Sequence, residues 1–190
     1  MNIQTLGQSN LFESFFDELL ELLRVYGIII RLLCDKEANM EQYTIREMKI
    51  EDYEGVKKLW MSIKGFAIRS IDDSREGVDK FLRRNPGCSV ICIMNNEVVG
   101  AILCGHDGRR GTLYHVCVRE DVRMHGIGKA MVVRCMESLK AEGINKVSLI
   151  AFTSNDIGNA FWKQVGWTKR EDLNYYDFTL NEANITAFNS

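Results

Sequence analysis

Apolar and polar positions follow two different periods along residues 43–180, and each period predicts one kind of element. Successive side chains of a strand point to opposite faces, whereas a helix returns to the same face every three or four residues. The two-residue period predicts strands over 43–48, 89–94, 97–104, 112–118, 147–152 and 174–180. The helical period predicts helices after Asp52, after Asp73, from about Gly126–Gly128 to Lys140, and over 157–165.

Turn residues separate these elements. Asn85-Pro86-Gly87 predicts a turn, and Asn95-Asn96 predicts the tight end of a hairpin between two strands. Residues 105–111 (GHDGRRG) predict a second turn, and residues 65–71 are expected to form a loop.

Polar residues at the predicted helix ends suggest how the helices begin and stop. Asp52 is a plausible N-cap of the first helix. Asp73 followed by Glu76 fits a capping box at the start of the second helix. Gly143 stands just past the third helix, where a C-terminal glycine is expected.

The elements follow in the order strand, helix, helix, three strands, helix, strand, helix and strand. This order predicts one mixed α/β (α+β) domain over 43–190, preceded by an N-terminal extension over 1–42. Within the extension, residues 11–33 repeat apolar side chains at helical spacing, so an amphipathic helix is expected there.

Three interpretations of this extension remain open. The helix packs on the domain, it packs on another copy of the chain in a homodimer, or the natural chain starts at Met40. Charged residues such as Glu18 and Arg24 interrupt the apolar stretch, so a membrane span is not expected. The start of the chain also lacks the basic segment and small-residue cleavage site of a secretory signal.

Composition narrows the classes of function. The 190 residues are 46% hydrophobic and 26% charged, and the formal net charge is −2 at pH 7. A dedicated nucleic-acid binder should show a clear basic excess, so no nucleic-acid partner is expected. No C-x-x-C pair occurs, and most cysteines fall in apolar stretches, which predicts reduced, buried thiols in a cytoplasmic protein. The cysteines are Cys34, Cys88, Cys92, Cys104, Cys117 and Cys135.

One cysteine and histidine spacing suggests a metal site. Cys104-x-His106 and His115-x-Cys117 lie on what is predicted to be one hairpin. The four side chains would face each other only if 104 paired with 117 and 106 with 115. That register would leave 112–114 in the loop although they have a strand pattern, so no metal is expected.

The segment 118–130 (VREDVRMHGIGKA) connects an apolar strand through a polar loop to an apolar helix. The first N–H groups of a helix lack partners within it, and the helix dipole puts partial positive charge there. Gly126 and Gly128 let a phosphate approach the backbone, and Arg123 can add a charge-assisted bond. By itself the segment fits a structural loop as well as an anion site, and it matches neither the dinucleotide nor the P-loop fingerprint.

The run Arg123-Met-His-Gly126-Ile-Gly128 resembles the acetyl-CoA signature of the N-acetyltransferase (GNAT) family, Arg/Gln-x-x-Gly-x-Gly/Ala at this strand-to-helix junction. Asn155 and the segment 161–167 (FWKQVGW) are similar to a second family segment, Asn-x₆-Tyr-x-x-x-Gly-Phe. The resemblance extends over about residues 43–180, and the stretch 107–118 is similar to a bacterial subgroup of uncharacterised members.

The resemblance implies the acyl-CoA N-acyltransferase fold, with a central mixed, mostly antiparallel sheet flanked by helices. It also implies an N-acetyltransferase that moves an acetyl group from acetyl-CoA, its cosubstrate, to a primary amine by direct attack. The acceptor would be a small-molecule amine, or a lysine or N-terminal amine of a protein. The residues implied to contact acetyl-CoA are Val116, Val118, Arg123, Met124, His125, Gly126, Ile127, Gly128, Lys129 and Asn155.

Within that set, the N–H of Val116 would hold the developing oxyanion. Val118 and the following loop would hold the pantetheine and pyrophosphate, and Asn155 would bond to the pantetheine arm. Two positions depart from the family: Met124 stands where many members have glycine, and Trp162 stands where many have the tyrosine that protonates the leaving thiolate.

Tryptophan is a donor without acid–base chemistry, so another group must protonate the thiolate, or the thiol leaves unaided. Tyr175 or Tyr176 are the candidates for that acid. His115 is the candidate for the general base, because an imidazole titrates near about 6.5, although a packed strand histidine is the alternative. Tyr114 is expected on the opposite sheet face from His115.

Asp72 and Asp73 precede the second predicted helix, and each could have a structural or a binding role. The resemblance places Asp72 and Asp73 beside the acceptor groove, where they would bind an ammonium group, but helix capping is the preferred role of Asp73. The Trp162 substitution keeps a rival open, namely a catalytically weak or inactive acyl-CoA-binding module with a regulatory or interaction role. A third hypothesis is an interaction protein that oligomerises through the helix over 11–33.

Overall fold

The computed structural model describes residues 42–189, so the helix predicted over 11–33 lies outside the described residues. The elements in chain order are β1 (Tyr43–Glu47), the 3-10 helix η1 (Ile50–Asp52), α2 (Tyr53–Ser62), β2 (Ala67–Arg69), α3 (Arg75–Arg84), β3 (Val90–Met94), β4 (Glu97–His106), β5 (Gly111–Val118), the 3-10 helix η2 (Glu120–Val122), α4 (Ile127–Ala141), β6 (Val147–Leu149), α5 (Asp156–Gln164) and β7 (Thr186–Phe188).

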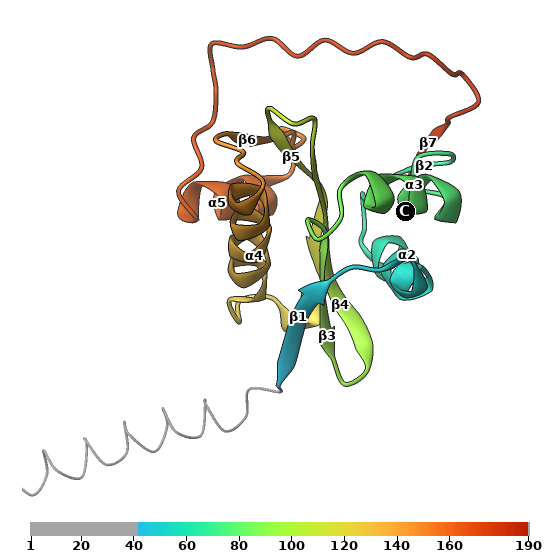
Figure 1. The fold of residues 1–190 in the computed structure, drawn as a ribbon, viewed down its shortest axis with the longest axis vertical. Coiled ribbons are helices and arrows are strands. Elements are labelled where there is room, and N and C mark those ends of the chain that lie inside the picture. The colour runs from blue at the N-terminus through green and yellow to red at the C-terminus, as the bar shows by residue number, and fades with distance from the viewer. Residues whose placement is uncertain (1–41, 190) are drawn as a thin grey trace, which may run out of the picture. The chain divides into compact units, whose positions relative to one another are not determined.

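Five strands form the central sheet in the order β1-β3-β4-β5-β6 (Figure 1). The first three pairings are antiparallel, and β5 pairs with β6 in parallel. This arrangement confirms the prediction of a mixed, mostly antiparallel sheet. In Figure 1 the helices α4 and α5 lie on one side of the sheet, and α2 and α3 lie on the other.

Alternation along the central strands supplies a hydrophobic core to each face of the sheet. In β3, Val90 and Cys92 pack with α4, whereas Ile91 between them packs with α2. Met131 of α4 and Trp60 of α2 are both fully buried, one in each core. Burying a large apolar side chain contributes about 1.5–3 kcal/mol, so these two cores hold the helices against the sheet.

The predicted hairpin and its turns are confirmed, and the metal alternative is not supported by the register. Asn95 and Asn96 have φ of 51° and 62°, as a two-residue hairpin turn requires. In the β4–β5 ladder, Cys104 faces Leu113 and His106 faces Gly111. The pairing of 104 with 117 and 106 with 115, which a metal site would need, is therefore absent from this hairpin.

The cysteines of the described residues are free and buried, as predicted. Burial raises the pKa of the Cys117 thiol to about 12, and that of Cys92 to about 11. These thiols therefore stay protonated and unreactive at neutral pH. None of the helices within residues 42–189 is long and apolar enough to cross a membrane.

The strand predicted over 174–180 is wrong. The chain runs from α5 to β7 without regular structure, and in Figure 1 this orange-red connection arches away from the sheet. Its large side chains are exposed, including Phe178 (87%) and Leu180 (93%). The two-residue period is present, but the backbone groups of 174–180 have no neighbouring strand in the part of the chain that the structure describes. The strand that follows, β7, pairs with β2.

The expected capping role of Asp73 is wrong, and Asp52 occupies the predicted N-cap position of α2 without a side-chain capping bond. Asp52 precedes α2, but its carboxylate accepts hydrogen bonds from Arg46 and from the N–H of Lys49. The hydrogen bond from Arg46 lowers the pKa of Asp52 below its ordinary value. At α3 the N-cap is Ser74, whose Oγ accepts from the N–H of Gly77 at 3.1 Å. The carboxylate of Asp73 is therefore available for another role.

Replacement of Ser74 tests which residue caps α3. We expect Ser74→Ala to lower the free energy of unfolding by about 1 kcal/mol, because the N–H of Gly77 loses its acceptor. Ser74→Asn, which keeps an acceptor at the same position, should stay within about 0.5 kcal/mol of the parent chain. Urea denaturation followed by far-UV circular dichroism measures both. Equal stability of the two variants would contradict the assignment.

Candidate active site

A bulge in β5 sets the geometry of the site. Ala101 of β4 faces Cys117 of β5, but Leu103, two residues on, faces Tyr114. β5 therefore advances three residues while β4 advances two, so His115 and Val116 share one partner position. His115 lies in the left-handed region with φ of 50°, which costs about 1–2 kcal/mol for a residue other than glycine.

The bulge places two consecutive side chains on the same face of the sheet. The ring of Tyr114 packs edge-on against Phe81 of α3, with ring centroids 5.9 Å apart. The ring of His115 lies 4.8 Å from that of Trp60 in α2. Both therefore face α2 and α3, and the expectation that Tyr114 and His115 point to opposite faces is wrong, because the extra residue interrupts the alternation.

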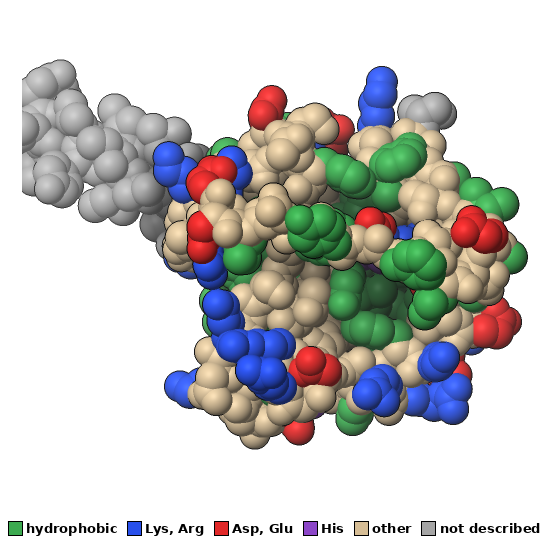
Figure 2. Space-filling view, turned by 90° about the horizontal axis from the view of Figure 1, so that it is seen from above, with side chains coloured by type: hydrophobic (Ala, Val, Ile, Leu, Met, Phe, Trp, Pro, Cys, Tyr) green, Lys and Arg blue, Asp and Glu red, His purple; other side chains and the backbone are tan. Residues whose placement is uncertain are grey.

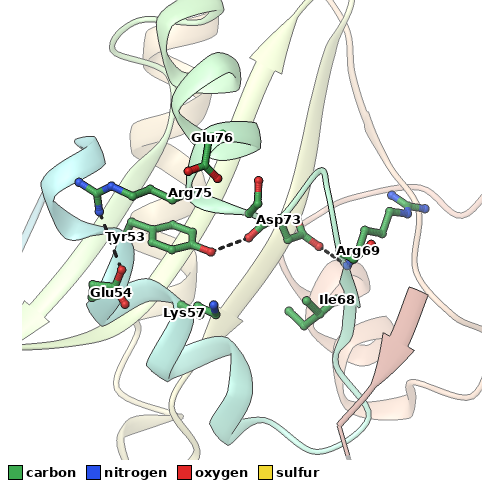
Figure 3. A pocket seen from close by; sticks show the side chains of 10 residues that line it. Tyr53, Glu54, Lys57, Ile68, Arg69, Asp73, Arg75 and Glu76 are labelled. Atoms are coloured by element: carbon green, nitrogen blue, oxygen red, sulfur yellow. Dashed lines mark hydrogen bonds and ion pairs between the residues drawn. The ribbon is translucent and has the colours of Figure 1, made fainter. Parts of the chain in front are cut away.

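Asp73 holds the imidazole of His115. Nε2 of His115 lies 2.6 Å from Oδ1 of Asp73, and only 5% of the Asp73 side chain is exposed. The N–H of Arg69 donates to Oδ2 of Asp73 at 2.6 Å, and the Tyr53 hydroxyl donates to its backbone carbonyl at 2.9 Å (Figure 3). An ionised Asp73 carboxylate would only accept hydrogen bonds, so a neutral imidazole beside it would carry its hydrogen on Nε2 and leave Nδ1 to take a proton.

Aromatic rings enclose the imidazole. Phe66 lies 5.0 Å from His115 and Trp60 lies 4.8 Å away, measured between ring centroids, and 18% of the His115 side chain remains exposed. The indole N–H of Trp60 is buried without a hydrogen-bond partner among the described residues. Figure 2 shows a hollow on this side of the molecule that is lined mainly by hydrophobic side chains. The histidine thus lies in a partly closed, apolar environment.

The predicted anion-binding loop joins η2 to α4. Met124 has φ of 67° and Gly126 has φ of 79°, and α4 begins at the next residue, Ile127. The Nε–H of Arg123 donates to the carbonyl of Val118 at 3.0 Å, which fixes the loop to the end of β5. The first N–H groups of α4 have no partner within the helix, and such N–H groups suit the binding of phosphate groups.

The side chains of this loop differ in their surroundings. Ile127 is buried with 1% exposed, so its backbone alone is available to a ligand. The side chain of Met124 is 96% exposed, and His125 and Lys129 are also exposed. A Cβ on Gly128 would lie 3.4 Å from the ring of Phe161, which is ordinary van der Waals contact, so α4 and α5 leave room for an alanine here.

An open strand edge leads from the histidine to this loop. β5 pairs with β6 only from Gly111 to Leu113, so within residues 42–189 no strand lies beside the edge of residues 114–118 that faces away from β4. The side chains of Val116 and Val118 pack on the α4 side. Unpaired backbone groups along 114–118 can therefore hydrogen-bond to an extended ligand.

The remaining predicted residues lie away from the histidine. Asn155 is the N-cap of α5, and its Oδ1 accepts from Gly158 at 2.9 Å, so its amide N–H groups are the part left for a ligand. Tyr175 and Tyr176 lie in the connection before β7 and are 66% and 85% exposed. Trp162 packs between Phe161 and Trp167, with ring centroids 5.0 Å from each.

A pocket of about 390 Å³ lies on the other side of Asp73, between the starts of α2 and α3 (Figure 3). Its lining carries both signs of charge, including Glu54, Glu76, Lys57 and Arg75. Arg75 lies 3.9 Å from Glu54, a distance at which an exposed pair contributes little. This pocket was not predicted, because its residues are brought together by helix packing and form no sequence motif.

Comparison with known proteins identifies the class. The pattern of the acetyltransferase (GNAT) family matches residues 45–167, so the chain belongs to this family, and the prediction of an N-acetyltransferase is confirmed. An acetyltransferase of Pectobacterium atrosepticum is 31% identical over 112 residues, which cover 59% of this chain and 78% of that protein.

Two solved structures share the fold. The PaiA N-acetyltransferase of Thermoplasma acidophilum, in complex with coenzyme A, has a TM-score of 0.59 at 14% identity and covers 76% of this chain and 96% of its own. An aminoglycoside acetyltransferase from an uncultured soil metagenomic sample, in complex with sisomicin, has a TM-score of 0.58 at 18% identity and covers 73% and 97%. The predicted fold is therefore confirmed.

The positive φ of Met124 leads to a stability prediction. Its side chain is almost fully exposed, so removing it loses little packing, whereas glycine removes the left-handed strain. We expect Met124→Gly to be about 0.5–1 kcal/mol more stable than Met124→Ala, because alanine loses the same side chain but keeps the strain. Thermal unfolding of the two variants measures the difference. If alanine proved the more stable, residue 124 would not have a left-handed backbone in solution.

Proposed function

We propose that the chain transfers an acetyl group from acetyl-CoA to a primary amine by direct attack, with His115 as general base. The observation that carries the proposal is the β5 bulge, which holds His115 on Asp73 beside the open strand edge of residues 114–118. That edge ends at the loop before α4. Base, acyl site and phosphate site would then follow one another along a single strand.

The backbone of the loop would bind the coenzyme. Main-chain N–H groups over 124–128 and the positive end of the α4 dipole suit a pyrophosphate, and Gly126 leaves the approach free of a Cβ. Arg123 can direct its terminal N–H groups to a phosphate while its Nε stays bound to Val118. The exposed side chains of His125 and Lys129 border this position. The residues present therefore fit coenzyme A.

The pantetheine arm would lie along β5. Its amide groups would pair with the free backbone groups near Val118, and the amide of Asn155 would bond to it from α5. The N–H of Val116, in the bulge where the ladder is interrupted, would donate to the acetyl oxygen and stabilise the developing oxyanion.

The base would remove a proton from the acceptor amine. A lysine-like ammonium has a pKa of about 10.4, so at pH 7 deprotonation costs about 4.6 kcal/mol. With Nε2 held by Asp73, Nδ1 of His115 would take the proton, directly or through a water. The carboxylate would also stabilise the imidazolium that forms. Tyr175 or Tyr176 would protonate the thiolate after closure of their segment, or the thiol would leave unaided.

The acceptor would be a small-molecule amine or an amine of a protein. Neighbours of the same fold are named for both kinds of acceptor, an aminoglycoside acetyltransferase and a ribosomal-protein-alanine N-acetyltransferase. The formal charge of −2 and the buried free thiols suit a cytoplasmic enzyme without a nucleic-acid partner. The Trp162 position motivates the rival, an acyl-CoA-binding module without catalysis.

Two measurements separate these functions. Calorimetry with coenzyme A tests the loop, since both functions require binding there. A thiol-release assay with acetyl-CoA over polyamines, aminoglycosides, amino acids and lysine peptides tests transfer. Binding together with release for at least one amine supports the enzyme. Binding without release across the panel supports the rival, and the absence of binding contradicts both.

Removal of the imidazole tests the base. We expect His115→Ala to lower kcat at least about tenfold, within the range for general base catalysis, while the affinity for coenzyme A stays unchanged. Tyr114→Phe is the matched control, because it alters the adjacent residue and keeps the ring against Phe81. Its kcat should stay within about twofold of the parent. A near-parental rate for His115→Ala would remove the assignment.

A further inference from the structure

The C-terminal residues 183–189 are bound to the loop that carries the partners of His115. β7 pairs with β2 in antiparallel register, with Ala67 opposite Phe188 and Arg69 opposite Thr186. Side chains extend the contact beyond both ends of this short ladder. We refer to residues 183–189 as the C-terminal strap and to residues 63–73 as the acceptor loop.

One end of the strap is held by Asn184. Its Oδ1 accepts from the N–H of Ile71 at 2.9 Å and of Asp72 at 3.3 Å, and its Nδ2 donates to Oδ2 of Asp72 at 2.7 Å. Ser70 adds reciprocal bonds, because its N–H donates to the carbonyl of Ile185 and its Oγ accepts from the N–H of Ile185. These contacts fix the backbone immediately before Asp73.

The other end is held by Asn189. Its Nδ2 donates to the carbonyls of Trp60 at 2.7 Å and Ile63 at 3.1 Å, which are near the end of α2. Its backbone exchanges hydrogen bonds with Gly65 and Phe66. The strap therefore runs along the acceptor loop from Phe66, which packs on His115, to Asp72, which precedes the hydrogen-bond partner of His115.

Phe66 and Ile68 pack the acceptor loop on α2, but its strand pairing depends on the strap. Of its elements, β2 is three residues long, and its only ladder within the described residues is the one with β7. Yet the N–H of Arg69, in β2, donates to Oδ2 of Asp73 at 2.6 Å. A displacement of β2 would therefore move the Asp73 carboxylate, whose other oxygen is 2.6 Å from His115.

We propose that the C-terminal strap is part of the active site, and that Asn184 is a positioning residue that acts through the acceptor loop on Asp73 and His115. This inference rests on the proposed function of His115 as the base. No hydrogen bond joins the strap to the loop over 123–128, so the proposal assigns the strap to proton removal from the acceptor and not to coenzyme binding. Its Phe188 also contacts Phe152 after β6, with ring centroids 5.8 Å apart.

An exchange of charge between Asp72 and Asn184 tests the proposal. In Asn184→Asp two carboxylates face each other, so the contact breaks, and we expect kcat to fall about tenfold. In the double variant Asp72→Asn with Asn184→Asp, the amide of residue 72 donates to the carboxylate of residue 184, which still accepts from the backbone N–H groups. Its kcat should return to within about threefold of the parent, with the net charge unchanged.

Matched measurements identify the origin of the effect. Asn95→Asp makes the same chemical change in the exposed turn between β3 and β4 and should leave kcat unchanged. The affinity of every variant for coenzyme A should equal that of the parent. If Asp72 instead bound the acceptor, the double variant would not recover and KM would rise, which would overturn the proposal. A loss in Asn184→Asp no larger than in Asn95→Asp would also overturn it.

Hydrogen exchange gives a readout that does not depend on catalysis. The amides of Arg69 and Ile71 should exchange at least about tenfold faster in Asn184→Asp than in the parent, and the double variant should restore their protection. Absence of transfer in the parent chain would contradict the proposed function but leave this comparison intact. Unchanged protection of both amides would contradict the strap, whatever the activity.

Discussion

The hydrogen bond between His115 and Asp73 joins parts of the chain that are 42 residues apart, and the candidate site depends on it. Each partner needs its own support. The bulge turns the imidazole towards α2 and α3, and the acceptor loop presents the carboxylate. Burial strengthens the interaction, because little water competes for a carboxylate whose side chain is 5% exposed. A left-handed backbone at His115 persists because several contacts hold it.

The two proposed sites along β5 differ in how far apart their residues are in the sequence. The proposed coenzyme site follows directly from the chain after Val118, since strand, loop and helix start are consecutive. The base site, in contrast, combines β5 with α2, the acceptor loop and the C-terminal strap. The edge of β5 would thus bring acetyl-CoA, held by residues close in sequence to β5, next to His115, which is held by residues far from it in sequence.

The sequence was sufficient for most of the fold because period and turn chemistry act locally. The two-residue period located β1, β3, β4 and β5, and the glycines at 126 and 128 located the start of α4. The bulge was not predictable, since residues 112–118 have an ordinary strand pattern. Asp73 with Glu76 fits a capping box as well as it fits its observed role, and only the packed structure shows that Ser74 caps the helix.

The strand expected over 174–180 failed for a related reason. Alternation describes what a segment can do, whereas a strand also needs a neighbour with free backbone groups. Here the ordered end of the chain lies beyond that segment, at β7, where Asn184 and Asn189 supply side-chain bonds that no two-residue period encodes. β2 escaped prediction as well, because three residues are too few to show a period.

The indole of Trp60 is a fluorescent group beside the proposed base, His115. Its indole is buried, and its centroid is 4.8 Å from that of the imidazole of His115. An imidazole that takes up a proton at this distance would bring a positive charge next to the π-system of the indole. We therefore expect the emission of Trp60 to respond to the charge of His115, over a background from the other two tryptophans, Trp162 and Trp167.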